Sequence, residues 1–132
     1  MIKDTMISTP NGDIPVQDLA VGDTVTTPDG IAKVSNIRIK ESNVTVTVVF
    51  HRHYSAGNFK LTGDWEELVF TLPEHDRKMD NLHRIHKIDI KTDIKKVDKE
   101  YNRRIPTYLL SLDGGDYYFA NGVKVRAEHG IQ

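Results

Sequence analysis

The sequence predicts a single all-β domain, and three observations support this fold class. Residues 44–50 are a run of alternating β-branched residues that ends in Phe50, which is the period-two pattern of a half-buried strand. Asn-Gly and Asp-Gly steps separate the strand-like runs, and both residues of such a step tolerate the positive φ of a tight hairpin turn. No segment has the length and caps of an amphipathic helix. A chain of 132 residues with 38% hydrophobic content has the size of one domain, residues 1–132, with one core.

The expected turns divide the chain into about nine or ten short strands, a spacing typical of a sandwich, a barrel or a β-complex. They lie at Pro10-Asn11-Gly12, Pro28-Asp29-Gly30, Asp113-Gly114-Gly115 and Asn121-Gly122. One helical turn is expected at residues 17–20, and one or two more at residues 76–82. After the strand at 44–50, residues 50–65 are predicted to form a protruding hairpin with Gly57-Asn58 near its tip. Residues 85–91 are predicted to form a strand that places Ile88 and Ile90 on one face.

Composition excludes several classes of function. Eighteen Lys and Arg residues balance nineteen Asp and Glu residues, so global charge gives no reason to expect nucleic acid or an anionic membrane as partner. The absence of cysteine excludes disulfides and thiolate chemistry. No apolar run approaches the roughly 18–20 residues that span a bilayer, and the polar N-terminus lacks the apolar stretch of a signal peptide. We therefore expect a protein of the cytoplasm or of a virion, not one secreted through a signal peptide.

Both ends of the chain carry recognisable motifs. Residues 5–25 contain Thr5, Ile7, Thr9, Pro10-Asn11-Gly12, Ile14, Leu19 and Val21-Gly22-Asp23, in that order. Residues 108–125 end with Phe119-Ala120-Asn121-Gly122-Val123-Lys124-Val125. Together they resemble the two terminal motifs of the Hint domain, the self-processing module of inteins and hedgehog proteins. The resemblance implies a Hint-like β-complex with little or no helix. It also implies that the strand around Ile7 lies beside the strand at residues 123–125, because the two ends meet at one active site.

The residues that carry the chemistry of that family are missing from the matching positions. The family begins with a Cys or Ser nucleophile, which aligns either one residue before Met1 or with Met1 itself, and a thioether cannot attack a carbonyl. Thr71, Leu72 and His75 form the best candidate for the Thr-x-x-His motif, but Leu72 stands where the threonine belongs. Arg126 and Ala127 replace the terminal His-Asn pair, and neither can do its chemistry. The resemblance thus implies a Hint scaffold without self-processing activity and without catalytic residues.

Other site hypotheses have less support. His51 and His53 lie two apart in a strand and share a face, but no acidic residue nearby completes a zinc site, so no metal or other cofactor is expected. Asp113-Gly114-Gly115-Asp116 offers two carboxylates, which are too few for calcium, and a hairpin turn explains all four residues. Aromatic and basic residues interleave near residue 50, yet an aromatic content of 8% makes nucleic-acid binding a weak alternative.

The predicted hairpin is the best candidate for a protein interface. It combines aromatic and basic residues, which protein interfaces select. These candidates are Phe50, His51, Arg52, His53, Tyr54, Phe59, Lys60 and Trp65. The charged stretch at residues 76–104 is either a solvated ribbon or a patch for an acidic partner.

Two functions follow from the sequence. The first is a non-enzymatic module that contacts a protein partner in a larger assembly, with a phage tail, baseplate or capsid as the assembly that the composition favours. No membrane or small-molecule substrate is expected. The second is an intein-like self-processing domain whose reacting residues were trimmed or replaced.

Overall fold

The structure, a computed structural model, describes residues 1–128 and is all-β apart from two short 3-10 helices. The strands are β1 (Met6–Thr9), β2 (Gly12–Pro15), β3 (Thr24–Thr27), β4 (Gly30–Ser42), β5 (Thr45–Arg52), β6 (Asn58–Asp64), β7 (Leu68–Thr71), β8 (His75–Lys78), β9 (Lys87–Asp89), β10 (Thr92–Glu100), β11 (Ile105–Asp113), β12 (Tyr117–Ala120) and β13 (Val123–Arg126). The helices are η1 (Val16–Asp18) and η2 (Met79–Arg84). The predicted fold class is confirmed.

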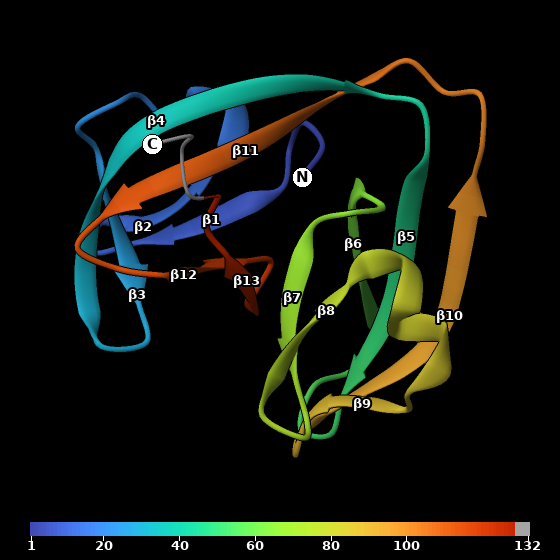
Figure 1. The fold of residues 1–132 in the computed structure, drawn as a ribbon. Coiled ribbons are helices and arrows are strands. Elements are labelled where there is room, and N and C mark those ends of the chain that lie inside the picture. The colour runs from blue at the N-terminus through green and yellow to red at the C-terminus, as the bar shows by residue number, and fades with distance from the viewer. Residues whose placement is uncertain (129–132) are drawn as a thin grey trace.

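The strands form three antiparallel sheets. The largest has the order β2-β1-β12-β13-β7-β8, the second β6-β5-β10-β9 and the third β11-β4-β3. Figure 1 shows two lobes, one built from β1–β3 and β11–β13 and the other from β5–β10. The pairing of Val125 with Val69 joins β13 to β7 and so carries the largest sheet from one lobe into the other. The N-terminus lies between the two lobes (Figure 1).

Two long strands arch over the molecule and position the site described below. β4 and β11 pair along their length, from Ile105 opposite Ser42 to Asp113 opposite Lys33. The register of this pairing shifts between Ser111 and Leu112, as it does at a β-bulge. The edge of β11 that faces away from β4 binds Met1 and Glu128.

The two terminal motifs share one sheet, but they are not direct neighbours. Ile7 of β1 pairs with Ala120 of β12, and Ala120 pairs with Val123 of β13. β12 therefore lies between the strand around Ile7 and the strand at residues 123–125, which corrects the expectation that these two strands would be side by side. Two strand spacings of about 4.8 Å separate them.

One core cluster runs through both lobes. Its largest fully buried side chains include Tyr118, Phe50, Met1, Ile7, Leu61, Met79, Leu82 and Leu110. Apart from Met1, they come from strands, which turn alternate side chains inward, and from η2. Among residues 1–128, no helix is long and apolar enough to cross a membrane.

Most predicted turns are confirmed, and one predicted strand is wrong. The turns at Gly12, Gly30 and Gly122 each close a hairpin with φ between 78° and 140° at the glycine. The turn at Gly114 joins β11 to β12, which lie in different sheets, so the hairpin predicted at residues 113–116 is wrong. Residues 85–91 are not one strand: β9 ends at Asp89, whose carboxylate accepts a hydrogen bond from the Lys91 backbone N–H at 2.8 Å. This local bond turns the chain into β10 and leaves Ile90 exposed. In residues 76–82 the helix begins only at Met79, after β8.

β5 and β6 form a hairpin that packs against the β12–β13 turn. β5 and β6 pair from Thr45 opposite Asp64 to His51 opposite Asn58, so the loop covers residues 53–57. Asn121 donates its side-chain N–H to the Lys60 carbonyl at 2.8 Å, and Arg52 lies 4.5 Å from the centre of the Phe59 ring. The Arg52 guanidinium also lies against Gly122, where an added Cβ would collide with it.

Gly122→Ala is expected to lower the free energy of unfolding more than Gly57→Ala does. Both glycines have φ near 80°, where alanine costs about 1–2 kcal/mol, but only Gly122 lies against a side chain. Displacing Arg52 from Phe59 adds about 0.5–1 kcal/mol. Urea unfolding of both variants checks this. Adding Arg52→Ala should bring the cost of Gly122→Ala down to that of Gly57→Ala, and an unchanged difference would contradict the account.

Candidate functional site between the two chain ends

Met1 lies in the interior, with 0% of its surface exposed. Its ammonium donates hydrogen bonds to both carboxylate oxygens of Glu67, at 2.7 and 2.8 Å, and to the Tyr108 carbonyl at 3.0 Å. The Tyr108 backbone N–H donates in return to the Met1 carbonyl at 2.8 Å. Met1 is thus fixed to the edge of β11 by its backbone and to Glu67 by its charge.

Glu67 is buried, and its carboxylate packs closely against the backbone at the end of β6. Its second carboxylate oxygen accepts the Asp64 backbone N–H at 3.0 Å, and the Glu67 N–H donates to the Asp64 carbonyl at 3.0 Å. A Cβ on Gly63 would collide with the Glu67 carboxylate and would lie 3.0 Å from the Met1 sulfur. Glycine at position 63 therefore allows the Glu67 carboxylate to reach the Met1 ammonium.

Burial raises the pKa of Glu67 above its ordinary value, although the Met1 ammonium and the Asp64 N–H both favour the charged form. The carboxylate of Asp64 also raises this pKa, by repulsion. Desolvation outweighs the ion pair here because Glu67 is surrounded by protein.

The C-terminal motif reaches the same edge of β11. The Glu128 backbone N–H donates to the Leu110 carbonyl at 2.7 Å, two residues from the position that binds Met1. Residues two apart in a strand lie about 6.6 Å from each other, so both chain ends converge on one short stretch. Ala127 is buried, and its N–H donates to the Asp116 carbonyl at 2.8 Å.

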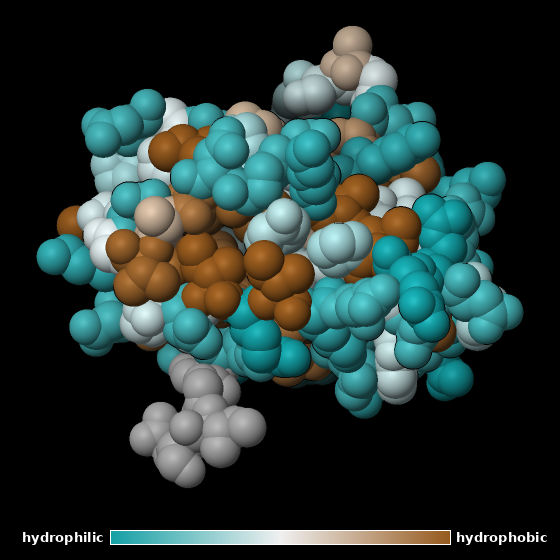
Figure 2. All heavy atoms as spheres, turned by 90° about the horizontal axis from the view of Figure 1, so that it is seen from above, coloured by the Kyte–Doolittle hydropathy of each residue, from teal (hydrophilic) through white to brown (hydrophobic). Residues whose placement is uncertain are grey.

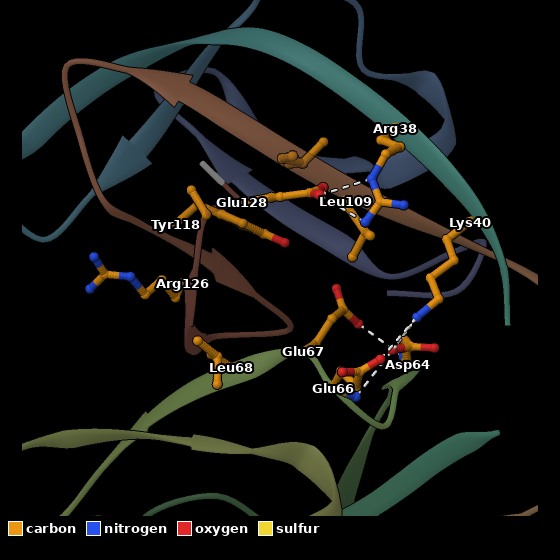
Figure 3. A pocket seen from close by; sticks show the side chains of 12 residues that line it. Arg38, Lys40, Asp64, Glu66, Glu67, Leu68, Leu109, Tyr118, Arg126 and Glu128 are labelled. Carbon is orange, nitrogen blue, oxygen red and sulfur yellow. Dashed lines mark hydrogen bonds and ion pairs between the residues drawn. The ribbon is translucent and has the colours of Figure 1, made fainter. Parts of the chain in front are cut away.

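A cleft of about 340 Å³ opens beside this point of convergence. Figure 3 shows Arg38 and Lys40 reaching in from β4, Tyr118 extending its ring from β12, and Glu67 rising from below. Arg38 pairs with Glu128 at 2.7 Å, and Lys40 pairs with Asp64 at 3.1 Å. The walls also include Glu66, Leu68, Leu109, Leu110, Arg126 and Ala127.

The predicted remnants of the family's active site do not all lie there. Met1, Arg126 and Ala127 do, but the Arg126 guanidinium turns away to Asp76 at 3.2 Å and to the Tyr117 hydroxyl at 3.1 Å. Thr5 is buried beside this region, and its carbonyl accepts the Val16 N–H at 2.8 Å.

Thr71, Leu72 and His75 lie at the far end of the β7–β8 hairpin, away from Met1. Thr71 is buried and donates its hydroxyl hydrogen to the His75 carbonyl at 3.2 Å, whereas Leu72 and His75 are exposed. Glu67 precedes β7, and Thr71 ends it, about 13 Å further along the strand.

Sequence reasoning missed Glu67, the residue that contacts Met1. Asp64 and Glu67 have the spacing of the Thr-x-x-His motif, three residues apart, and they precede a strand as β6 gives way to β7. A search for that spacing with acidic residues in place of threonine and histidine would have found them.

The interface candidates differ widely in exposure. Phe50 is in the core, stacked 5.1 Å from the half-buried Phe59, so Phe50 as a surface contact is wrong. Trp65 is half-buried beneath Lys78. His51 and Arg52 are half-buried, and His53, Tyr54 and Lys60 are exposed, with 86% of Tyr54 open to solvent.

Of the described residues at this point of convergence, neither Met1 nor Ala127 carries a hydroxyl or thiol nucleophile. Met1 offers a thioether, Ala127 a methyl group, and Glu67 an acceptor whose two oxygens are already engaged. Within residues 1–128, no group of three or more His, Cys, Asp or Glu side chains is arranged to hold a metal ion.

Solved structures of similar shape identify the fold. The crystal structure of the gp41-1 intein aligns with a TM-score of 0.76 at 15% identity, over 95% of each chain. The Msm DnaB1 intein splicing domain bound with zinc aligns with a TM-score of 0.74 at 20% identity, over 96% of this chain and 98% of that one. The solution structure of the bacterial intein-like domain from Clostridium thermocellum aligns with a TM-score of 0.77 at 16% identity, over 95% of this chain and 96% of that one. Neither a protein-family model nor a curated protein matches the sequence. This chain therefore has the Hint fold, the fold of inteins and intein-like domains.

Proposed function

We propose that this chain is a Hint-fold module that does not process itself and that works by contacting another protein. The observation that carries the proposal is the burial and hydrogen bonding of Met1, which lies where the family has its nucleophile. Met1 fills it, buried completely, and Glu67 and the Tyr108 carbonyl occupy the hydrogen-bonding positions of its ammonium. At the other end, Arg126 is engaged with Asp76 and Ala127 has no reactive group. A larger assembly, of which a phage virion is the example that the composition suggests, is the proposed setting.

A second candidate, a self-processing domain, is favoured by one observation. Met1 and Glu128 still bind β11 two residues apart, at Tyr108 and Leu110. A scaffold that brings its two ends to one point has the geometry that self-processing needs. Against it, Met1, Arg126 and Ala127 are not the residue types that carry the family's chemistry.

The two functions are separated by a cleavage assay. The chain is placed between two reporter domains and incubated with and without thiol, and we expect it to remain one polypeptide. A matched fusion carries Met1→Cys, Asp64→Thr, Glu67→His, Arg126→His and Ala127→Asn, which restores the family's residue types at these positions. Release of a reporter from the unaltered chain, mapped to either junction, would overturn the proposal. Release from the altered chain alone would assign the inactivity to these five residues.

A further inference from the structure

The second half of β4 is an open edge of its sheet. β3 pairs with β4 only as far as Lys33, and the loop before β3 bonds both backbone groups of Val34. Over residues 35–42, β11 is the one strand of residues 1–128 that pairs with β4. Figure 1 shows β4 along the upper rim of the molecule. The side of this stretch that faces away from β11 is therefore unpaired.

The bonds made by β11 show which backbone groups of β4 face the open edge. In an antiparallel pair, two residues directly opposite each other either bond one another or both turn their N–H and C=O away. Tyr108 bonds Met1 with both its N–H and its carbonyl, so its partner Ile39 turns its own groups away from β11. The Leu110 carbonyl accepts its bond from the C-terminal segment, so the same holds for its partner Ile37.

The next position along the strand agrees with this pattern. Pro106 has no N–H, and it lies opposite Glu41, where the alternation requires no ladder bond. Ile37, Ile39 and Glu41 thus present their N–H and C=O groups at intervals of about 6.6 Å along one edge. Within residues 1–128 no hydrogen bond uses these groups. An extended chain is the structure that supplies acceptors and donors at that spacing.

The side chains distinguish this edge from the other long open edge of the molecule. β10 has no partner opposite β5 beyond Asp93, but residues 95–100 are charged except for Val97, which is how natural edges avoid pairing. On β4, Ile37 is half-buried and Ile39 is 61% exposed. Figure 2 looks down on this rim and shows hydrophobic side chains exposed among hydrophilic ones.

The opposite face of the same stretch determines which strand fits. Arg38 and Lys40 lie two apart and share that face, and Arg38 remains about half exposed beside Glu128. A second copy of β4 that brought Ile39 onto either isoleucine would place Arg38 opposite Arg38 or Lys40, and like charges directly opposite are destabilising. Acidic residues at these positions avoid the repulsion.

We propose that the open edge of β4 binds an extended segment of a partner protein as an added antiparallel strand, with apolar residues opposite Ile37 and Ile39 and acidic residues between them. The inference rests on the proposed function and names the chemistry of its partner. It also moves the main contact from the β5–β6 hairpin to β4.

Amide hydrogen exchange tests whether the edge is open. In the free chain the amides of Ile37, Ile39 and Glu41 should exchange at least about tenfold faster than those of Arg38 and Lys40, which bond β11. Bound peptide should slow the first three and leave the other two unchanged.

The binding test uses the full chain and acetyl-Thr-Glu-Val-Glu-Val-Glu-Thr-amide, with heats of binding and backbone amide NMR signals recorded. A valine opposite Ile39 points its N–H at β4, whereas the glutamate beside it points its N–H at solvent. Methylating the backbone nitrogen of one valine should therefore weaken binding at least about tenfold, and methylating that of the central glutamate less than about twofold. The analogue with three lysines in place of glutamate should bind at least about fivefold more weakly.

One pair of variants locates the edge. Ile39→Pro removes the N–H at the open edge without breaking a bond to β11, and it should weaken the peptide at least about fivefold. Ile39→Ala keeps the N–H and should weaken it less than about threefold. If Ile39→Pro does not fold, the methylated peptides decide the question on the unaltered chain.

Four results would overturn the inference. They are no binding at millimolar concentration, equal binding of the two methylated peptides, equal binding of the lysine analogue, and equal exchange of all five amides in the free chain. Protection of Ile37 and Ile39 that rises with protein concentration alone would assign the edge to a second copy instead. If no peptide binds and the reporter fusion stays intact, this inference fails while the absence of self-processing stands.

Discussion

Glu67→Ala is expected to lower the free energy of unfolding by about 3–5 kcal/mol, because it removes one partner of a buried ion pair. The Met1 ammonium would stay in the interior with only the Tyr108 carbonyl as acceptor, and the Asp64 N–H would lose its carboxylate. Urea unfolding at pH 7 measures the loss. Glu66→Ala is the matched control, since that carboxylate is about half exposed and pairs with Lys40 at 3.5 Å, an interaction worth about 0–1 kcal/mol. Equal losses for the two variants would contradict a special role for Glu67.

The pH dependence of this loss shows whether burial or the ion pair dominates. Burial raises the folded-state pKa of Glu67, so the folded state binds the proton more tightly than the unfolded state does. Its contribution to stability is then fully present below the unfolded-state pKa and falls as pH rises through the folded-state pKa, by at most about 1.4 kcal/mol per pH unit. The loss caused by Glu67→Ala should therefore be larger at pH 4 than at pH 7. A loss that grows with pH instead would mean that the Met1 ammonium lowers the pKa more than burial raises it.

Much of the fold could be predicted from sequence because hairpins leave local signals. The Asn11-Gly12, Asp29-Gly30 and Asn121-Gly122 steps each mark a turn that forms, since these residues tolerate positive φ whatever surrounds them. Order along the chain then carried the Hint resemblance at both ends. The sheet order could not be predicted from sequence. β12 lies between β1 and β13 because β1 pairs with a strand more than a hundred residues away in the chain.

The site was harder to predict because its key residue departs from the family's chemistry. His75 was the sequence candidate for the histidine of the Thr-x-x-His motif, yet it lies near the tip of the β7–β8 hairpin. The residue that binds the Met1 ammonium is Glu67. Periodicity cannot identify such a residue, because a glutamate in a charged segment normally faces solvent. Only the tertiary contact with the chain end, through the space that Gly63 leaves, distinguishes Glu67 from its neighbour Glu66.

The interface prediction for the β5–β6 hairpin was partly wrong because it was based on residue types and not on which of those residues are buried. Phe50, Arg52 and Phe59 are the residue types of an interface, yet they pack on one another, with the buried Phe50 stacked on the half-buried Phe59 and Arg52 over the Phe59 ring. Aromatic residues serve cores and interfaces alike, so their type does not separate the two uses. The alternation of residues 44–50 already placed Phe50 on the same face as Val46 and Val48, and both of those are buried.

Phe50→Ala should accordingly lower the free energy of unfolding by about 3–5 kcal/mol, the range for deleting a buried aromatic ring. The ring is fully buried, and its loss would also remove the stacking partner of Phe59. Tyr54→Ala, in the loop of the same hairpin, is the matched control and should change the free energy by less than about 0.5 kcal/mol, since 86% of Tyr54 is exposed. Urea unfolding of both variants decides the matter. If Phe50→Ala left the unfolding free energy unchanged and Tyr54→Ala lowered it, the β5–β6 hairpin would owe its stability to its tip and Phe50 would again be a candidate for an interface.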